Sequence, residues 1–176
     1  MLKAEQDQRA PASDEILEAD FVVVGSGAAG LTGAITARRR GLSVIVLEAQ
    51  DVVGGTTARS GTWIWSPNNR WMREAGFTDE RDDAIRYMAR LSFPERYQSD
   101  AERFGLDAHE YEMLNVFYST SGTALEELAE AGALDPVVKS NAPDYFADLP
   151  EDKAPYGRVI VSRGRNRPDQ LTGAEW

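Results

Sequence analysis

The chain contains no cysteine among its 176 residues, and this absence restricts the chemistry that it can carry out. It excludes disulfides, thiolate metal sites, iron–sulfur ligation and a cysteinyl link to a prosthetic group within the chain. Histidine is almost absent as well, because His109 is the only one and lies in a polar stretch at an expected helix start. We interpret His109 as a solvated residue rather than a catalytic one, and we expect no metal site.

Positive charge and long apolar segments are also scarce. The chain has 19 basic against 29 acidic residues, a formal net charge of -10, which disfavours binding to nucleic acid or to an anionic membrane. No apolar run approaches the roughly 18 residues that a transmembrane helix needs, and residues 1–18 lack the apolar core of a secretory signal. We therefore expect a cytoplasmic protein with no nucleic-acid partner and no membrane span.

What the chain does have is a glycine-rich turn between an apolar strand and a helix. Residues 21–24 form a run typical of a buried parallel strand, and residues 28–40 are rich in helix formers. At the junction, Gly25 permits a tight turn, Gly27 lets the backbone approach a pyrophosphate, and Gly30 lets helix and strand pack closely. This pattern predicts a dinucleotide site, and the alternative is a simple strand-to-helix bend.

Three further features agree with a dinucleotide site. The start of the helix, at Ala28 and Ala29, presents free N–H groups and a positive dipole end to phosphates. A second apolar run over residues 42–47 ends in Glu48, whose carboxylate is spaced to accept hydrogen bonds from ribose hydroxyls. The Gly-Gly-Thr-Thr sequence over residues 54–57 favours FAD over NAD as the ligand.

These segments together resemble the N-terminal part of the fumarate reductase/3-ketosteroid dehydrogenase family of FAD-dependent oxidoreductases. The resemblance rests on residues 25–31, 41–48 and 53–69. The ketosteroid dehydrogenase branch is more similar, because it pairs the Gly-Gly-Thr-Thr loop with a nearby Ser-Gly and an Ile-Trp-x-Pro segment. The resemblance implies an α/β fold with a Rossmann-like, glutathione-reductase-type FAD-binding βαβ unit, followed by a mostly helical region.

The resemblance also implies a set of cofactor-binding residues. They are Gly25, Gly27, Ala28, Ala29, Gly30, Glu48, Gly54, Gly55, Thr56, Thr57, Ser60 and Gly61. Flavoproteins that attach FAD covalently through histidine usually carry that histidine shortly after the Gly-Gly loop. Because residues 57–61 contain none, we expect noncovalently bound FAD.

Two stretches indicate chemistry at a substrate. Trp63 and Trp65 follow the cofactor loop, and they either line an apolar substrate pocket or are ordinary core residues of a strand. Residues 144–150 resemble a segment of ketosteroid dehydrogenases in which a tyrosine lines the active site and assists proton removal. That resemblance implies that Tyr145 is catalytic, and the alternative is a tyrosine in a surface loop.

Apolar residues at helical spacing predict three helices in the second half of the chain. One helix is expected from Thr78 onward, a second over residues 110–117, and a third from a capping box of Thr123 and Glu126 to Gly132. The side chains expected to face inward are Ala84, Ile85, Met88 and Leu91, then Met113, Leu114 and Phe117, and finally Leu125, Leu128 and Ala129.

The expected organisation has four parts. They are a polar arm over residues 1–18, the FAD-binding Rossmann-like unit with its Gly-Gly loop over 19–77, the helical start of a capping and substrate region over 78–150, and an irregular basic segment over 151–176. Proteins of the family are considerably longer and close the flavin site with a second cofactor-binding segment. We therefore expect the chain to be an N-terminal fragment.

Three functions agree with the sequence. The resemblance implies an FAD-dependent dehydrogenase that removes a proton from the carbon α to a ketone and transfers a hydride from the neighbouring carbon to the flavin. Its partners would be an apolar cyclic ketone or steroid-like small molecule and an electron acceptor. The alternatives are a fumarate reductase-like flavoprotein acting on a small dicarboxylate, and a noncatalytic nucleotide-binding remnant.

Overall fold

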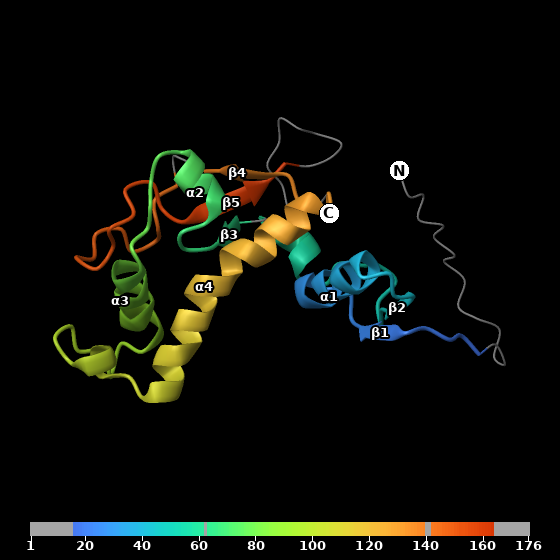
Figure 1. The fold of residues 1–176 in the computed structure, drawn as a ribbon, viewed down its shortest axis with the longest axis horizontal. Coiled ribbons are helices and arrows are strands. Elements are labelled where there is room, and N and C mark those ends of the chain that lie inside the picture. The colour runs from blue at the N-terminus through green and yellow to red at the C-terminus, as the bar shows by residue number, and fades with distance from the viewer. Residues whose placement is uncertain (1–15, 62, 140–141, 164–176) are drawn as a thin grey trace.

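A computed structural model describes residues 16–61, 63–139 and 142–163. Its elements are, in order, β1 (Phe21–Val24), α1 (Ala28–Arg39), β2 (Val44–Leu47), the 3-10 turn η1 (Thr57–Arg59), β3 (Trp63–Trp65), α2 (Arg70–Glu74), α3 (Arg81–Ser92), the 3-10 turn η2 (Glu102–Gly105), α4 (Ala108–Glu130), β4 (Pro136–Val138) and β5 (Val159–Ser162). Figure 1 shows β1, α1 and β2 grouped at one end, while α2 and the C-terminal half of α4 lie beside a second sheet and α3 lies next to the N-terminal half of α4.

The first sheet confirms the predicted βαβ unit and the α/β class. Strands β1 and β2 run parallel, with Phe21 paired to Val44 and Val24 paired to Leu47. Helix α1 connects the two strands and packs against both of them. The apolar, largely β-branched sequence of both strands suits a parallel sheet, which is normally covered on its faces by helices.

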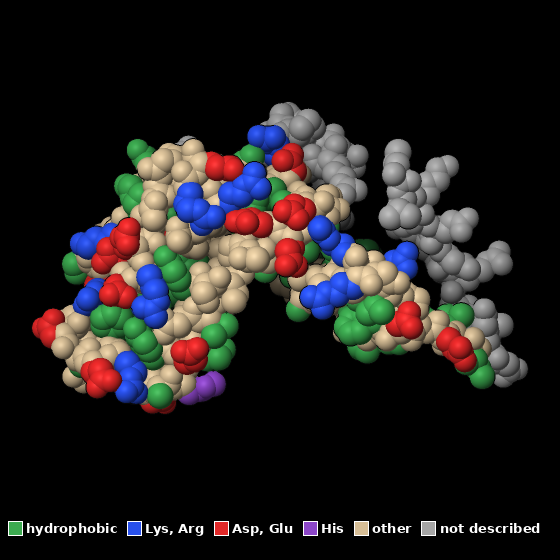
Figure 2. Space-filling model, viewed as in Figure 1, with side chains coloured by type: hydrophobic (Ala, Val, Ile, Leu, Met, Phe, Trp, Pro, Cys, Tyr) green, Lys and Arg blue, Asp and Glu red, His purple; other side chains and the backbone are tan. Residues whose placement is uncertain are grey.

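This first sheet is only partly covered. In β1, Val23 is 8% exposed, whereas Val22 and Val24 are 53% and 84% exposed. Within the part of the chain that the structure describes, no third strand pairs with β1 or β2. Figure 2 shows hydrophobic side chains at the surface of this end of the molecule. The βαβ unit therefore presents apolar surface that a further layer or strand would cover.

The second sheet is antiparallel, with the strand order β3-β5-β4. The central strand β5 is buried along its length and pairs Val161 with Trp63 on one side and with Val137 on the other. A hydrophobic core lies against this sheet. It consists of Leu125, Leu134 and Ile160, with Ile64, Trp71 and Leu128 packed around them.

Strand β5 lies in a stretch that was expected to be irregular. That expectation for residues 151–176 is wrong for Val159–Ser162, which form the buried centre of the second sheet. The run Val-Ile-Val is β-branched and apolar, but four residues are too few to show a period. Its pairing partners β3 and β4 are also distant in the sequence. Residues 164–176 lie outside the described part of the chain.

Helix α3 confirms the first helix predicted after Thr78. Ala84 and Ile85 are fully buried, and Met88 is nearly so, as their helical spacing predicts. Leu91 is 37% exposed, so its predicted inward position is wrong. It lies in the last turn of the helix, where the end of the element leaves it open to solvent.

The second and third predicted helices are one continuous helix, α4. Its N-terminus is capped by Asp107, whose side chain accepts a hydrogen bond from Glu110 N at 2.9 Å, while Glu110 Oε2 accepts one from Asp107 N at 3.1 Å. The intervening polar residues do not interrupt the helix, because Ser119 Oγ donates to Asn115 O at 2.8 Å within it. The capping box predicted to begin at Thr123 is therefore wrong.

The two halves of α4 are buried to different extents. Leu125 is buried and Leu128 packs against it in the core, as predicted. Met113 is 55% exposed, so its predicted inward position is wrong, whereas Phe117 is 42% exposed but stacks its ring on Trp65. The helix ends where expected, since Gly132 follows it with a φ of +71°. Of the helices that the structure describes, none combines the length and apolar character needed to cross a membrane.

Candidate functional site

Two glycines of the turn between β1 and α1 are required by the local backbone. Gly25 has a φ of +94°, which L side chains rarely adopt, and its N–H donates to Leu47 O at 2.7 Å. A Cβ on Gly30 would lie 2.0 Å from the carbonyl oxygen of Gly25 and 3.1 Å from Val23 Cγ1. Gly25 therefore makes the turn, and Gly30 lets the helix pack closely on the strand.

Gly27 differs from these two glycines, because the fold does not require it. It is the N-cap of α1, with a φ of -70° and a ψ of 179° that any residue adopts. A Cβ at this position would meet nothing within 4 Å. The first turn of α1 carries no acidic side chain, and the space beside Gly27 is open, although the N–H of Ala28 already donates to Thr57 Oγ1 at 3.1 Å. This arrangement fits the approach of a phosphate to the backbone.

Glu48 lies at the end of β2, next to the glycine turn. Its Oε2 accepts hydrogen bonds from the side chain of Ser26 and from Ser26 N, the latter at 3.0 Å, and its Oε1 accepts one from Gln50 N at 3.0 Å. These bonds, above all the one from the Ser26 hydroxyl, lower the pKa of Glu48 to about 2. The carboxylate therefore stays ionised, as an acceptor for ribose hydroxyls must.

The Gly-Gly loop folds over the glycine turn. Ser26 Oγ accepts a hydrogen bond from Gly54 N at 2.7 Å, and Thr57 Oγ1 accepts one from Ala28 N at 3.1 Å. A Cβ on Gly55 would lie 3.8 Å from the Cα of Gly27. Sequence reasoning missed Ser26, which joins the loop to Glu48, although its place between two glycines of the motif was a usable signal.

The remaining predicted cofactor residues continue this loop. The carbonyl of Thr56 accepts a hydrogen bond from Arg59 N at 3.1 Å, and Ser60 Oγ donates to Thr57 O at 2.8 Å, which together close the turn η1. A Cβ on Gly61 would lie 3.5 Å from Trp63 Cδ1. The loop is therefore continuous with the aromatic residues of β3.

Two residues that the sequence assigned separately to the substrate side lie together. The rings of Trp63 and Tyr145 are stacked, with centroids 6.4 Å apart and an interplanar angle of 14°. Both are open to solvent, since Trp63 is 47% exposed and Tyr145 is 89% exposed. Lys139 adds a positive charge, because its Nζ lies 5.1 Å from the centre of the Trp63 ring.

Trp65 lies elsewhere. Its ring stacks on Tyr87 at 6.2 Å and on Phe117 at 6.1 Å between centroids, and the guanidinium of Arg158 lies 5.5 Å from its centre. Strand alternation puts Trp63 and Trp65 on the same face of β3, but Trp65 belongs to an aromatic group that packs around Arg158. His109 is exposed in the first turn of α4.

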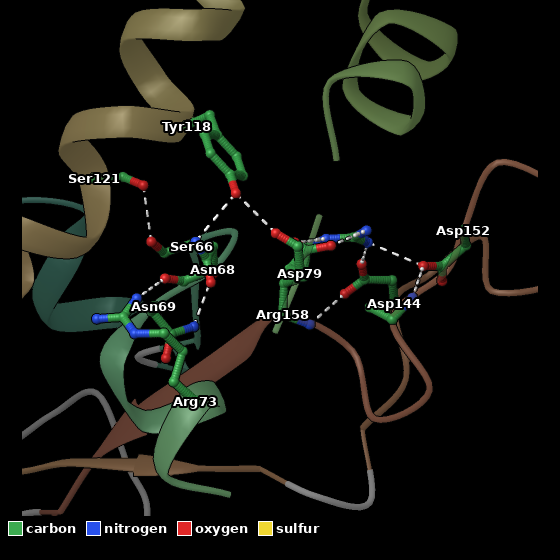
Figure 3. Close-up of polar contacts among 11 residues, drawn as sticks. Ser66, Asn68, Asn69, Arg73, Asp79, Tyr118, Ser121, Asp144, Asp152 and Arg158 are labelled. Atoms are coloured by element: carbon green, nitrogen blue, oxygen red, sulfur yellow. Dashed lines mark hydrogen bonds and ion pairs between the residues drawn. The ribbon is translucent and has the colours of Figure 1, made fainter. Parts of the chain in front are cut away.

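Arg158 is the centre of a buried ionic cluster that sequence reasoning missed (Figure 3). Its guanidinium donates to Asp79 at 2.6 and 3.0 Å, to Asp144 at 2.6 Å and to Asp152 at 2.9 Å. The side chains of Arg158 and Asp79 are 0% exposed, and those of Asp144 and Asp152 are 1% exposed. An arginine directly before the apolar run Val-Ile-Val was the signal available in the sequence.

Burial and charge act in opposite directions within this cluster. Burial raises the pKa of Asp79, although the hydrogen bonds from Arg158 oppose that effect. Burial disfavours the charged form of Arg158, but the carboxylates of Asp79 and Asp144 hold its pKa above its usual range. Burial, with the nearby negative charges, also raises the pKa of Tyr87 to about 12. The guanidinium therefore stays charged and holds the carboxylates in place.

The cluster fixes the segment that carries Tyr145. Asp144 directly precedes Tyr145, and its Oδ1 accepts a hydrogen bond from Arg158 N at 2.9 Å. Asp79, at the entry to α3, is held in addition through its carbonyl, which accepts a bond from the Tyr118 hydroxyl at 2.8 Å. Figure 3 shows Asp144 and Asp152 reaching Arg158 from the loop that contains Tyr145. Residues 144–158 are thereby tied to β5 and α3.

The comparison with known protein families identifies this architecture. The model of the FAD binding domain family matches residues 20–156, and the chain therefore belongs to this family. The resemblance drawn from residues 25–69 is confirmed. Among relatives, 4-oxocyclohex-2-ene-1-carboxylate 5-dehydrogenase of Sinomonas cyclohexanicum is 36% identical over 150 residues, which cover 85% of this chain and 23% of that enzyme.

Two further similarities concern steroid dehydrogenases. 3-Oxosteroid 1-dehydrogenase of Mycolicibacterium smegmatis is 49% identical over 71 residues, which cover 40% of this chain and 12% of that enzyme. The crystal structure of 3-ketosteroid delta1-dehydrogenase from Sterolibacterium denitrificans matches with a TM-score of 0.58 and 30% identity, over 82% of this chain and 23% of that one. The chain thus spans less than a quarter of the length of these relatives.

The lowered pKa of Glu48 predicts how the nucleotide end of the site responds to acid. A carboxylate whose pKa falls on folding contributes its interactions in full above its ordinary pKa, and loses them as the pH falls through the folded value. The bonds between Glu48 and Ser26 should therefore persist below pH 4.5 and disappear only toward pH 2. The carboxyl carbon shift of Glu48, followed by NMR, checks this result, and a midpoint near 4.5 would contradict it.

Proposed function

We propose that this chain supplies the ADP-binding part of an FAD site and the adjoining aromatic side of a substrate site. The enzyme would be a dehydrogenase that oxidises a CH–CH bond next to the ketone of a cyclic substrate. The observation that carries the proposal is the position of Gly61 at the end of the predicted cofactor loop, two residues before Trp63, where an added Cβ would lie 3.5 Å from Trp63 Cδ1. It joins the predicted cofactor loop directly to the exposed pair of Trp63 and Tyr145, so that a cofactor and a flat substrate can meet there.

The residues present fit noncovalent FAD. Gly27 leaves open space at the start of α1, Glu48 is an ionised acceptor, and the loop of residues 54–57 closes over both. The chain has no cysteine, and residues 57–61 have no histidine to which a flavin could be attached. A bound flavin supplies the hydride acceptor, while the protein supplies orientation and acid/base groups. An external electron acceptor then has to reoxidise the enzyme.

The exposed aromatic pair favours a cyclic ketone as the substrate. Stacked aromatic rings bind a flat apolar ring through their faces, but they form few favourable contacts with a small acyclic dicarboxylate. A dicarboxylate requires converging cations, whereas Lys139 is the one cation that contacts the pair in the described part of the chain. The relatives agree with this choice, since the 4-oxocyclohexene carboxylate and the 3-oxosteroids after which they are named are cyclic ketones.

We assign proton removal at the carbon next to the ketone to the hydroxyl of Tyr145. The ring stacks on Trp63, and Asp144 beside it is anchored by Arg158, so the backbone holds Tyr145 next to Trp63 while its side chain remains 89% exposed. No described residue forms a hydrogen bond with this hydroxyl. Because a neutral phenol must lose its own proton to accept the one from carbon, a basic group from outside the described residues would have to take the proton of the Tyr145 hydroxyl.

Replacing Tyr145 by phenylalanine tests this assignment in a complete protein that carries these residues. Tyr145→Phe should lower turnover of a cyclic ketone by about 10²-fold, because proton transfer by a positioned side chain contributes that much or more. Tyr156→Phe is the matched control, since Tyr156 is also exposed and lies in the same segment. Turnover is measured by reduction of an artificial electron acceptor, and unchanged turnover in Tyr145→Phe would contradict the assignment.

A further inference from the structure

We propose that Lys139 makes the pair of Trp63 and Tyr145 a site for acidic cyclic ketones. The ring of such a ketone would lie on the aromatic pair, and its carboxylate would pair with the Lys139 ammonium. This inference rests on the proposed function of the same site and goes beyond it. It separates a small carboxylated ring from a neutral fused-ring ketone, two classes that the aromatic pair alone would accept.

The backbone of the second sheet fixes the position of Lys139. Its N–H donates to Val159 O at 3.2 Å, which extends the pairing of β4 with β5 by one residue. Val137 and Trp63 both pair with Val161, so they point to the same face of the sheet. Lys139 is two residues beyond Val137 and therefore points to that face as well. The ammonium over the Trp63 ring is thus a consequence of strand register.

The charge of Lys139 is available to a ligand. Among the described residues, no carboxylate lies within ion-pair distance of Lys139. Its ammonium instead lies over the face of the Trp63 ring. Most of the exposed arginines differ in this respect, as Arg39, Arg70, Arg73, Arg81, Arg96, Arg103 and Arg163 each lie within that distance of a carboxylate. In a chain of net charge -10, an ammonium beside an exposed aromatic surface is a local exception. It offers a single positive charge at the edge of a ring-binding surface.

The number of charges selects the class of ligand. One ammonium neutralises one carboxylate, so a monoanion fits and a dianion would leave a negative charge without a partner. Of two other cations near β3, Arg158 is fully buried and committed to Asp79, Asp144 and Asp152, and Arg163 forms an ion pair with Asp135. The site therefore favours a ring that bears a ketone and one carboxylate over a neutral steroid and over a dicarboxylate.

The test compares two probes that share the ring and the ketone, 4-oxocyclohexanecarboxylate and its uncharged methyl ester. Both are titrated into the 176-residue chain, and the indole N–H signal of Trp63 is followed by NMR after assignment with Trp63→Phe. The acid should bind about five- to tenfold more tightly than the ester, as expected for one partly exposed charge-assisted contact. Lys139→Met should remove this preference and Lys139→Arg should keep it. Lys153→Met is the matched control and should change nothing.

The outcomes separate this inference from the function on which it rests. If acid and ester bind equally, or if Lys139→Met retains the preference for the acid, the role of Lys139 is wrong and the aromatic substrate site stands. If neither probe nor a 3-oxosteroid shifts the Trp63 signal, the proposed substrate site itself is overturned. If the chain binds the acid more tightly and this preference depends on a positive charge at residue 139, the result supports the role of Lys139 and the substrate site alike.

Discussion

Replacing Arg158 by leucine is expected to lower the free energy of unfolding by about 3–5 kcal/mol, a large share of the stability of an ordinary domain. The substitution leaves the carboxylates of Asp79, Asp144 and Asp152 buried without a counter-charge. No other arginine or lysine that the structure describes forms an ion pair with these three carboxylates. Urea unfolding followed by circular dichroism measures the loss.

Arg163→Leu is the matched control for this prediction. Arg163 also forms an ion pair, with Asp135 at 3.6 Å, but the two side chains are 47% and 62% exposed. Exposed pairs contribute little, so this variant should change the free energy of unfolding by no more than about 0.5 kcal/mol. Equal effects of the two substitutions would mean that the cluster around Arg158 contributes no more to the free energy of unfolding than an exposed ion pair does.

Replacing Gly27 by valine is expected to abolish binding of ADP and FAD without unfolding the chain. A valine side chain would project into the open space at the start of α1 and keep a pyrophosphate from the backbone amides. The fold should tolerate the change, because the backbone of Gly27 is extended and a Cβ there meets no atom within 4 Å. Calorimetric titration with ADP measures binding, and the circular dichroism spectrum should match the wild type.

Gly30→Ala gives the opposite pattern and serves as the control. The added Cβ would lie 2.0 Å from the Gly25 carbonyl oxygen, so this variant should lose stability before it loses affinity. If Gly27→Val bound ADP as tightly as the wild type, the glycine turn would be a structural bend and no phosphate site.

The βαβ unit could be predicted from the sequence because its signals are local. The strand, the glycine turn, the helix and the acidic residue follow one another within about 30 residues, and each needs only its neighbours in the chain. Ser26 was missed because its role is not local. Its role depends on Gly54, which comes 28 residues later and meets it only when the loop folds back.

The helical region shows where local signals mislead. Thr123 and Glu126 have the spacing of a capping box, but the helix had already begun at Ala108 behind the cap of Asp107. The serine and threonine residues between the two expected helices lie within α4, where the hydroxyls of Ser119 and Thr120 bond to carbonyls of the same helix. A continuous helix therefore carries a sequence that, by itself, indicates two.

The second sheet and the ionic cluster could not be predicted, because they depend on contacts between distant segments. Arg158 meets Asp79 across 79 residues of sequence, and periodicity contains no signal for such a pairing. Trp63 was assigned to the substrate side as an aromatic residue after the cofactor loop, and Tyr145 through the family resemblance. That they stack on each other, with Lys139 alongside, is visible only in the folded chain.

The most direct test of the central claim is an amide NMR spectrum of the labelled 176-residue chain, titrated with ADP. The account predicts that the largest shifts occur at Gly27, Ala28, Glu48, Gly54 and Thr57, which surround the open start of α1, and that Gly27→Val abolishes them. An absence of shifts at millimolar ADP, or shifts confined to α3, α4 and the second sheet, would contradict it.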